Sequence, residues 1–502
     1  MFNQLRNLNL SVGLTISIYG TVTISSAFYP ELKNPGRGCK LKSNAAVVDQ
    51  LRTLETLKSN PIRLVESEPC SFPDAATACV AVIGLGYVGL PLTLGFAKGS
   101  RAIGFDINSQ KVSELNNGLD FTGEVTGTEL KAADAEFTTD ASALKNADVI
   151  VVCVPTPVNS HNRPDYGPLL SASRTIGIHM KRGAVIVFES TVDPGTTEDR
   201  CLPIIEAVSG MKLGLDFNLG YSPERINPAD PTRKLADIKK IVSGSTPACA
   251  DFMEALYSRV IRAGLYKATS IRVAEAAKIL ENTQRDVNIA LMNQMMMLFD
   301  KMGIKSTDVI AAASSKWNFH HYRPGLVGGH CIAVDPYFLV DAGRRHGLAM
   351  ELVAAARAVN EQTPLFLVEK IEELMSHRRG GVNKAKVLVL GRSFKEDCPD
   401  TRNSKAYPMM DALWNRGADV YNFDPVAFDD HFEGGRGSVN IEDPAANGPY
   451  DAIVITLAHN VFREQFDATT LKALAHKHAP LIDMRGNFEN DETTDWFNYW
   501  RP

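Results

Sequence analysis

The chain has 502 residues, of which 44% are hydrophobic and 22% are charged. That length allows two or three domains with large cores, and the composition is ordinary for a folded globular protein. The formal net charge of −5 gives no support for a general nucleic-acid-binding protein, so local Lys and Arg side chains must meet any anionic ligand. We therefore expect no nucleic-acid partner.

Residues 1–77 contain no motif that we can interpret. After Arg6 no charged residue occurs until Glu31, which is compatible with a signal peptide or a membrane anchor. From Leu8 to Ile18, however, apolar residues alternate with polar or small ones, and a period of two favours a strand over a membrane helix. We predict a poorly ordered N-terminal extension without membrane contact, and we keep a targeting or anchor segment as the alternative.

Beyond residue 77, short apolar runs alternate with helical patterns. Strands are expected at residues 79–83, 102–105, 148–154 and 184–188, with a helix at 90–98. Alternation of this kind predicts a parallel sheet covered by helices on both faces. We assign this first domain to residues 78–268.

A glycine-rich turn, Gly84-Leu-Gly-Tyr-Val-Gly89, joins the first of these strands to its helix. Glycines permit a tight turn and let a pyrophosphate approach the helix N-terminus, where free N–H groups favour an anion. Asp106 ends the next strand, where a carboxylate can accept both ribose hydroxyls and would repel a 2′-phosphate. Together these features predict an NAD site, in preference to an NADP site or a glycine-rich packing turn.

The segment Ser270–Met302 is predicted to form one long helix, about 50 Å at 1.5 Å per residue. Such a helix is better explained as a connection between two domains, with a dimer partner against it, inside a central region at residues 269–375. Lys278 and Asn282 are four residues apart and share one face. A solvated polar stripe is the alternative, but apolar or small neighbours indicate that the stripe faces something.

Cys331 lies in the run Gly-Gly-His-Cys-Ile-Ala-Val-Asp. Gly325, Gly328 and Gly329 precede it and permit close approach of the backbone to a ligand. A nicotinamide cofactor removes hydride from an alcohol, and a cysteine can capture the resulting aldehyde. A site that holds both could therefore take an alcohol to an acid. The alternative is a small core cysteine, and position alone does not decide between the two.

A second strand–helix series begins after Gly380-Gly381 and lacks a glycine fingerprint. Its expected strands are residues 386–390, 419–423, 451–456 and 481–482. We predict a second, smaller doubly wound domain at residues 376–502. The expected fold class is therefore α/β, with two Rossmann-like doubly wound domains joined by a long central helix.

Eight cysteines are scattered through the chain without the spacing of metal ligands, and a protein of this size does not need disulfides. Their distribution predicts a reducing compartment, a cytoplasmic location and no metal site. At most one of the eight thiols is expected to be reactive.

The chain resembles the UDP-glucose/GDP-mannose dehydrogenase family over about Cys79 to Gly486. The matching motifs are Gly84–Leu92 (GLGYVGLPL), Glu189–Thr197 (ESTVDPGTT), Tyr221–Pro228 (YSPERINP), Lys278–Asp286 (KILENTQRD), Arg323–Tyr337 (RPGLVGGHCIAVDPY) and Gly391–Ser404 (GRSFKEDCPDTRNS). Several motifs in order are far more specific than any one of them. The resemblance implies an NAD-dependent, four-electron oxidation of a sugar C6 alcohol to a carboxylate.

The resemblance also implies catalytic roles. Cys331 would be the nucleophile, forming a thiohemiacetal and then a thioester. Lys278 would stabilise negative charge on the C6 oxygen, and Asn282 would help to hold that oxygen and the water. Asp335 would assist the water or tune Lys278.

Two further residues match groups that act at thioester hydrolysis. Glu224 matches a glutamate proposed as general acid or base, and Thr191 matches a hydroxyl near the catalytic water.

Binding residues follow from the same motifs. Matches to NAD contacts are Gly84, Gly86, Tyr87, Val88, Gly89, Asp106, Lys111, Thr156, Thr191 and Arg402. Matches to nucleotide-sugar contacts are Glu224, Arg225, Ile226, Asn227, Lys278, Asn282, Arg323, Gly328, Phe394, Lys395 and Arg485. Arg323 is the candidate for a contact supplied by the partner subunit of a homodimer or a larger homo-oligomer.

The sugar itself is less closely defined. The runs Ser315–Phe319 and Tyr322–Cys331 are most similar to the branch that oxidises UDP-N-acetylglucosamine or UDP-N-acetylgalactosamine. Cys331–Asp335 favours the UDP-N-acetylmannosamine branch, and UDP-glucose is a further alternative. We predict a UDP-N-acetylhexosamine, with UDP-N-acetylglucosamine first. Arg392 stands where the family usually has an apolar or aromatic residue, which puts the local substrate geometry in doubt.

Two other functions were weighed. A catalytically silent binding protein is disfavoured because Cys331, Lys278, Asn282, Glu224 and Asp335 are all present. A two-electron dehydrogenase of a small hydroxy acid is disfavoured by the second doubly wound domain and the cysteine loop.

Overall fold

The computed structural model describes residues 14–16, 22–24, 70–120, 122–226, 232–427 and 437–502. The chain divides into two compact units, Met1–Ser67 and Glu68–Pro502. In the first, β1 (Leu14–Ile16) pairs antiparallel with β2 (Val22–Ile24), in agreement with the strand expected from the alternating pattern. Among the described residues, no helix is both long enough and apolar enough to span a bilayer. The other predictions for residues 1–69 lie outside the described residues.

The first sheet of the second unit has eight strands in the order β10-β9-β8-β7-β6-β3-β4-β5. Its strands are β3 (Val80–Ile83), β4 (Ala102–Phe105), β5 (Ala135–Thr138), β6 (Val149–Val152), β7 (Val185–Phe188), β8 (Asn218–Tyr221), β9 (Lys240–Gly244) and β10 (Leu265–Lys267). The helices between them are α3 (Gly89–Ala97), α4 (Ser109–Asn116), α5 (Gly127–Ala132), α6 (Gly167–His179), α7 (Leu202–Ser209) and α8 (Pro247–Tyr257). Strands β3, β4, β6 and β7 are buried along their whole length, as expected for parallel strands with both faces covered.

The second sheet has six strands in the order β13-β12-β11-β14-β15-β16, and its strand pairs are parallel. The strands are β11 (Lys386–Leu390), β12 (Asp419–Phe423), β13 (Ser438–Asn440), β14 (Ala452–Ile455), β15 (Pro480–Asp483) and β16 (Asn498–Trp500). Helices α13 (Ala406–Asn415), α14 (Asn460–Gln465), α15 (Ala468–Leu474) and α16 (Asp491–Trp496) complete this domain. Numbered within each domain, both sheets contain the order 3-2-1-4-5-6 of a dinucleotide-binding fold. The predicted fold class is confirmed.

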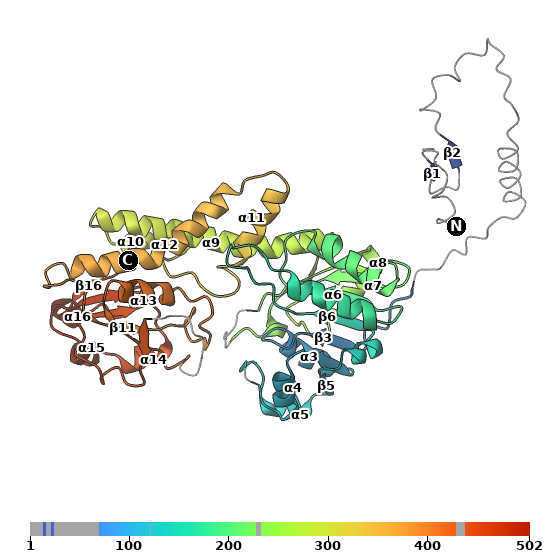
Figure 1. Ribbon diagram of the computed structural model, residues 1–502, viewed down its shortest axis with the longest axis horizontal. Coiled ribbons are helices and arrows are strands. Elements are labelled where there is room, and N and C mark those ends of the chain that lie inside the picture. Colours follow the sequence, from blue (N-terminus) through green and yellow to red (C-terminus); the bar gives the residue numbers. More distant parts are fainter. Residues whose placement is uncertain (1–13, 17–21, 25–69, 121, 227–231, 428–436) are drawn as a thin grey trace, which may run out of the picture. The chain divides into compact units, whose positions relative to one another are not determined.

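Two long helices connect the sheets. Helix α9 (Ile271–Lys301) begins after Ser270, whose side chain accepts a hydrogen bond from the backbone of Val273 at 3.2 Å. Helix α12 (Glu351–Leu374) lies alongside it, and Arg357 of α12 pairs with Asp286 of α9 at 2.5 Å (Figure 1). The shorter α10 (Ser306–Ser314) and α11 (Asp335–Arg345) lie between them in sequence. The long helix predicted at Ser270–Met302 is therefore present within one residue at each end.

The first sheet domain extends further toward the N-terminus than residue 78. Phe72 stacks on Phe252 of α8 with ring centroids 5.4 Å apart. The guanidinium of Arg259 donates to the carbonyl of Ala75 at 3.1 Å. Residues from Cys70 onward therefore contribute to the packing of this domain.

Candidate active site

The three glycines of the turn after β3 have different steric surroundings. A Cβ on Gly84, which has a φ of +93°, would lie 2.9 Å from the carbonyl oxygen of Cys153, and one on Gly89 would lie 1.9 Å from that of Gly84. A Cβ on Gly86 would meet nothing within 4 Å. Gly84 and Gly89 are thus required by the turn itself, whereas Gly86 leaves open space where a pyrophosphate would approach the start of α3. Val88 is the N-cap residue of that helix.

The acidic residue at the end of β4 is held in place by three donors. Asp106 accepts from the backbone of Leu85 at 2.9 Å, from the backbone of Asn108 at 2.9 Å and from Lys111 Nζ at 3.0 Å. These bonds fix its carboxylate beside the glycine turn, where the ribose of a bound NAD would lie. The residues present therefore fit this cofactor.

Thr156 and Thr191 follow the adjacent strands β6 and β7. The hydroxyl of Thr156 donates to the carbonyl of Thr191 at 2.6 Å. Both lie at the carboxyl ends of the strands, beside the point where the strand order reverses between β3 and β6. Ligands of doubly wound sheets bind at this edge.

Cys331 lies in the turn that leads into α11. Its carbonyl accepts from the backbone of Val334 at 3.0 Å and of Asp335 at 2.8 Å. Burial raises the pKa of the Cys331 thiol, and the charge of Lys278 acts in the opposite direction. Because the pKa stays above its ordinary value, the resting group is a thiol, and its attack on a carbonyl requires that a proton be removed.

Helix α9 presents two polar side chains toward this turn. Lys278 and Asn282 are both buried, one turn apart. The amide of Asn282 donates to Asp335, the first residue of α11, at 2.5 Å. Lys278 lowers the pKa of both Cys331 and Asp335, so its charge acts on both. The structure therefore brings together four of the predicted catalytic residues.

Asp335 should make the turnover number depend on pH on the acidic side of neutrality. Burial raises its pKa to about 6, against the opposing influence of Lys278 and Asn282. The turnover number should therefore fall as the pH is lowered through about 6, because a protonated Asp335 can no longer accept a proton. Asp335→Asn should lose turnover at every pH, by roughly 100-fold or more. The pH profile of NADH formation checks both results.

The same raised pKa has a consequence for stability. The folded state binds this proton more tightly than the unfolded state, so the free energy of unfolding should fall as the pH rises from about 4 to about 6. Asp335→Asn should remove this cost and raise the free energy of unfolding at pH 7, on the order of 2 kcal/mol. Denaturation at pH 7 and pH 4 tests this, since the gain should disappear near pH 4. An equally large gain at both pH values would contradict the assignment.

Glu224 follows β8. One carboxylate oxygen accepts from the backbone of Arg225 at 2.6 Å and from the backbone of Ile226. The other, Oε2, is buried and has no hydrogen-bond partner among the residues that the structure describes. The side chain of Arg225 is directed elsewhere, because its guanidinium pairs with Glu281 at 2.8 and 3.2 Å.

His330 connects the cysteine turn to both sheet domains. Its ring stacks on Tyr87 of the glycine turn, with centroids 6.4 Å apart, and lies edge-on to Phe394 at 6.0 Å. Its Nε2 lies 3.0 Å from Asp400, which also accepts from Arg402 at 2.7 Å. Burial would raise the pKa of Asp400, but the hydrogen bonds from His330 and Arg402 outweigh it and hold that pKa well below its ordinary value.

The glycines before His330 are packed against the second domain. A Cβ on Gly328 would lie 2.7 Å from the carbonyl oxygen of Asn403, and one on Gly329, with a φ of +80°, would lie 2.7 Å from the ring of Phe394. We expected these glycines to approach a ligand. The structure shows that they permit close approach of the loop at residues 391–404, whose residues Phe394 and Lys395 are half-buried.

Three further residues were predicted to contact the nucleotide sugar, and they are Arg485, Arg323 and Asn227. Arg485 donates to Glu396 at 2.9 Å, near Gly325. Arg323 is exposed, and its Nε donates to His321 at 3.3 Å, so it does not lie buried in the site of its own chain. Asn227 falls outside the described residues.

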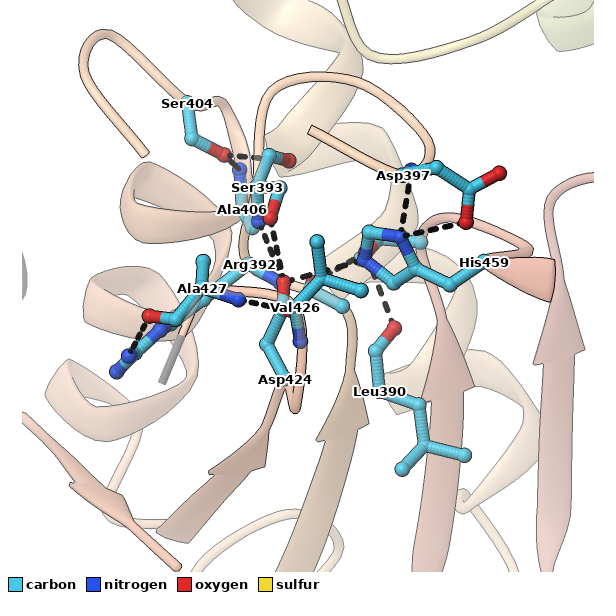
Figure 2. Close-up of polar contacts among 12 residues, drawn as sticks. Leu390, Arg392, Ser393, Asp397, Ser404, Ala406, Asp424, Val426, Ala427 and His459 are labelled. Atoms are coloured by element: carbon cyan, nitrogen blue, oxygen red, sulfur yellow. Dashed lines mark hydrogen bonds and ion pairs between the residues drawn. The ribbon is translucent and has the colours of Figure 1, made fainter. Parts of the chain in front are cut away.

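The unusual Arg392 is directed away from the substrate loop. It is 2% exposed, and its guanidinium donates to the carbonyl of Ala427 at 2.5 Å. Figure 2 shows its backbone and that of Ser393 donating to Asp424, which also contacts the ring of His459 at 3.3 Å. The charge of Arg392 therefore binds the loop after β12 within its own domain, while Phe394 contacts the cysteine turn at Gly329 and His330.

A cavity of about 1270 Å³ lies between the two sheet domains. Tyr87, Ile226 and Arg402 belong to its lining, together with Cys398 and Asp400. Cys331 and Lys278 are not part of that lining. The cavity therefore reaches the glycine turn and the loop of the second domain. Tyr87, which lines the cavity, stacks on His330, the residue before Cys331.

Comparison with known proteins agrees with this geometry. Three models of the UDP-glucose/GDP-mannose dehydrogenase family match consecutive segments: the NAD binding domain at residues 78–261, the central domain at 272–362 and the UDP binding domain at 388–490. The chain belongs to this family. It is accordingly an NAD-dependent oxidoreductase of nucleotide sugars.

Individual relatives cover nearly the same region. A UDP-N-acetyl-D-glucosamine 6-dehydrogenase of Pseudomonas aeruginosa is 43% identical over 415 residues, which are 82% of this chain and 98% of that protein. One of Salmonella typhi is 43% identical over 407 residues, or 81% of this chain and 95% of that protein. The solved structure of a UDP-D-ManNAc dehydrogenase from Pyrococcus horikoshii matches with a TM-score of 0.75 at 30% identity, covering 84% of this chain and 98% of the other.

Proposed function

We propose that this protein oxidises the C6 hydroxyl of UDP-N-acetylglucosamine to the carboxylate, using two NAD per sugar. The observation that carries the proposal is the half-buried Cys331 together with the buried Lys278, Asn282 and Asp335, beside an NAD-binding turn, in a chain 43% identical to two proteins of that name. Bound at the turn, the cofactor would accept hydride from C6.

The catalytic residues support a sequence of covalent steps at Cys331. After the first oxidation, the thiol adds to the C6 aldehyde, and its proton passes to a nearby base. The ammonium of Lys278 stabilises the negative charge that develops on the C6 oxygen. The second oxidation leaves a thioester, and attack by water then breaks the carbon–sulfur bond and releases the acid with the Cys331 thiol.

Two carboxylates are available for the proton transfers. Asp335 is tied to Asn282 at the start of α11, and its pKa of about 6 suits a base that works near neutral pH. Glu224 presents an unpartnered oxygen, as judged over the described residues, which suits a group that receives a proton from water. We assign thioester hydrolysis to Glu224, with Thr191 beside the water.

We further propose a homodimer formed through α9. Val273, Leu280, Leu291 and Leu298 are all exposed, and their spacings of 7 and 11 residues return to one side of a helix with 3.6 residues per turn. A second copy of the chain covering this stripe could place its own Arg323 at the nucleotide site. Light scattering that gives the mass of a single chain would contradict the dimer.

We keep the cytoplasmic location as a prediction. It rests on the expected reducing compartment, and the seven cysteines that the structure describes are all free.

A substrate panel tests the proposed function. UDP-N-acetylglucosamine should give the highest kcat/KM among UDP-N-acetylglucosamine, UDP-N-acetylgalactosamine, UDP-N-acetylmannosamine and UDP-glucose. Absorbance should show two NADH for each sugar consumed. One NADH per sugar would indicate a simple alcohol dehydrogenase. Preference for UDP-N-acetylmannosamine would contradict the proposal and give this protein the substrate named for the Pyrococcus horikoshii relative.

A further inference from the structure

Behind Glu224 lies a buried lysine that neither the motifs nor the proposed catalytic steps account for. Lys240 begins β9 and is 2% exposed. Its Nζ lies 3.7 Å from the unpartnered Oε2 of Glu224. A buried carboxylate oxygen without a hydrogen bond is costly, and a nearby cation reduces that cost without satisfying the oxygen. The geometry leaves one position at Oε2 for a water or a substrate group.

The position of Lys240 is fixed by groups other than Glu224. Its Nζ donates to Glu189 Oε2 at 2.7 Å and to the carbonyl of Pro223 at 3.2 Å. The hydroxyl of Tyr257 donates to the other oxygen of Glu189 at 2.5 Å. These bonds join the ends of β7, β8 and β9 to α8. The ammonium is therefore held behind Glu224 and is buried among the residues that the structure describes.

The network of Lys240, Glu189 and Glu224 contains more acidic than basic groups. One ammonium, that of Lys240, lies between the two carboxylates of Glu189 and Glu224. Burial would lower the pKa of Lys240, but both carboxylates raise it above its ordinary value, so the ammonium stays protonated. The other titratable groups coupled to the network are Cys153 after β6, Tyr221 of β8, Tyr257 of α8, Cys331 of the cysteine turn and Tyr87 of the glycine turn.

We propose that Lys240 is a positioning residue that keeps the carboxylate of Glu224 directed at the water that hydrolyses the Cys331 thioester. This inference rests on the proposed function. In the step that it serves, the water oxygen bonds to the thioester carbon and its proton passes to Glu224. The carbon–sulfur bond then breaks, and the sulfur of Cys331 leaves and regains a proton. No electrons are transferred in this step.

The alternative is that the Lys240–Glu189 pair serves only to hold β7 against β9. Lys370 provides a matched control for that role. It is also buried, at 5% exposed, and it pairs at 2.6 Å with both Asp300 and Glu373, far along α9 and α12. Loss of either ammonium leaves two carboxylates without their cation, but only Lys240 lies beside Glu224.

The experiment compares Lys240→Met, the double variant Glu189→Met/Lys240→Met and Lys370→Met. The double variant removes a buried ion pair completely, which is often neutral for stability, so it keeps the test open if Lys240→Met does not fold. For both Lys240 variants we expect kcat to fall roughly tenfold or more with little change in KM. The fall in kcat is expected because, without the ammonium behind it, Glu224 no longer holds its free Oε2 in place for the water.

Single-turnover measurements give the decisive signal. In the Lys240 variants two NADH per chain should form at once, followed by slow turnover, and mass spectrometry should find the sugar acyl group attached to Cys331. Lys370→Met should keep the kcat of the unmodified protein and accumulate no thioester. The proposal is overturned if the double variant has the unmodified kcat and no accumulation, or if both Lys240 variants fail to fold. Absence of sugar-dependent NADH in the unmodified protein would instead count against the proposed function.

Discussion

Cys331→Ser should lower the rate of the four-electron oxidation by at least about a thousandfold while leaving the protein folded. A serine hydroxyl is a far weaker nucleophile, and burial already raises the pKa of the thiol that it would replace. The first hydride transfer does not need a covalent bond, so the variant should release no more than one NADH per sugar and stop at the aldehyde. Absorbance gives the NADH count, and mass spectrometry of the quenched reaction identifies the sugar product.

Cys249→Ser is the matched control for this substitution. Cys249 is a buried cysteine of α8 whose sulfur donates to the carbonyl of Leu219 at 3.3 Å, a bond that a serine hydroxyl can replace. It should retain two NADH per sugar at the unmodified rate. Full turnover to the acid by Cys331→Ser would show that the thiol is not the nucleophile.

Gly89→Ala and Gly86→Ala should fail in different ways, although they lie three residues apart. A methyl group on Gly89 would overlap the carbonyl oxygen of Gly84, at 1.9 Å, so the turn itself must shift. We expect a loss of about 3 kcal/mol in stability and roughly 100-fold in NAD affinity. A methyl group on Gly86 meets nothing within 4 Å, so Gly86→Ala should unfold at the same temperature as the unmodified protein.

Gly86→Ala should nevertheless bind NAD poorly, because its methyl group occupies the space that the pyrophosphate needs. Calorimetric titration with NADH and thermal unfolding of both variants separate the two effects. Unchanged NADH affinity in Gly86→Ala would place the pyrophosphate away from this turn.

The buried parallel strands were the part of the fold most completely predicted from sequence. Strands β4, β11 and β12 have the predicted bounds. For β4 and for most of β11 the reason is that a strand covered on both faces is a continuous apolar run. Strand β9 was not predicted. It begins with Lys240, ends in Ser-Gly and pairs antiparallel with β8, so neither composition nor the strand–helix alternation indicates it.

The site was predicted as a set of residues but not as a set of contacts. Asn282 and Asp335 are 53 residues apart, and His330 and Asp400 are 70 apart, so no local pattern connects them. Asp400 and Lys240 were missed for this reason. Glu189 stood within a recognised motif, but only the fold shows that its partner is a lysine two strands away in the sheet. Arg392 was singled out as a departure from the family pattern, and the structure supplies the direction of its side chain.

The two sheets share one strand order, yet the acidic residues at the ends of their second strands are used differently. Asp106 holds three donors of its own domain, whereas Asp424 receives the backbone N–H groups of Arg392, Ser393, Val426 and Ala427, the Ser393 hydroxyl and the His459 ring. Figure 2 shows how completely this carboxylate is enclosed. A ribose bound to Asp424 would have to replace one of these donors, which would break the loop that the donor belongs to. The two halves therefore share one architecture but differ at this position. The NAD binding domain leaves space at its glycine turn, whereas the UDP binding domain fills the equivalent edge with its own loop, so we expect no competition between cofactor and nucleotide for one site.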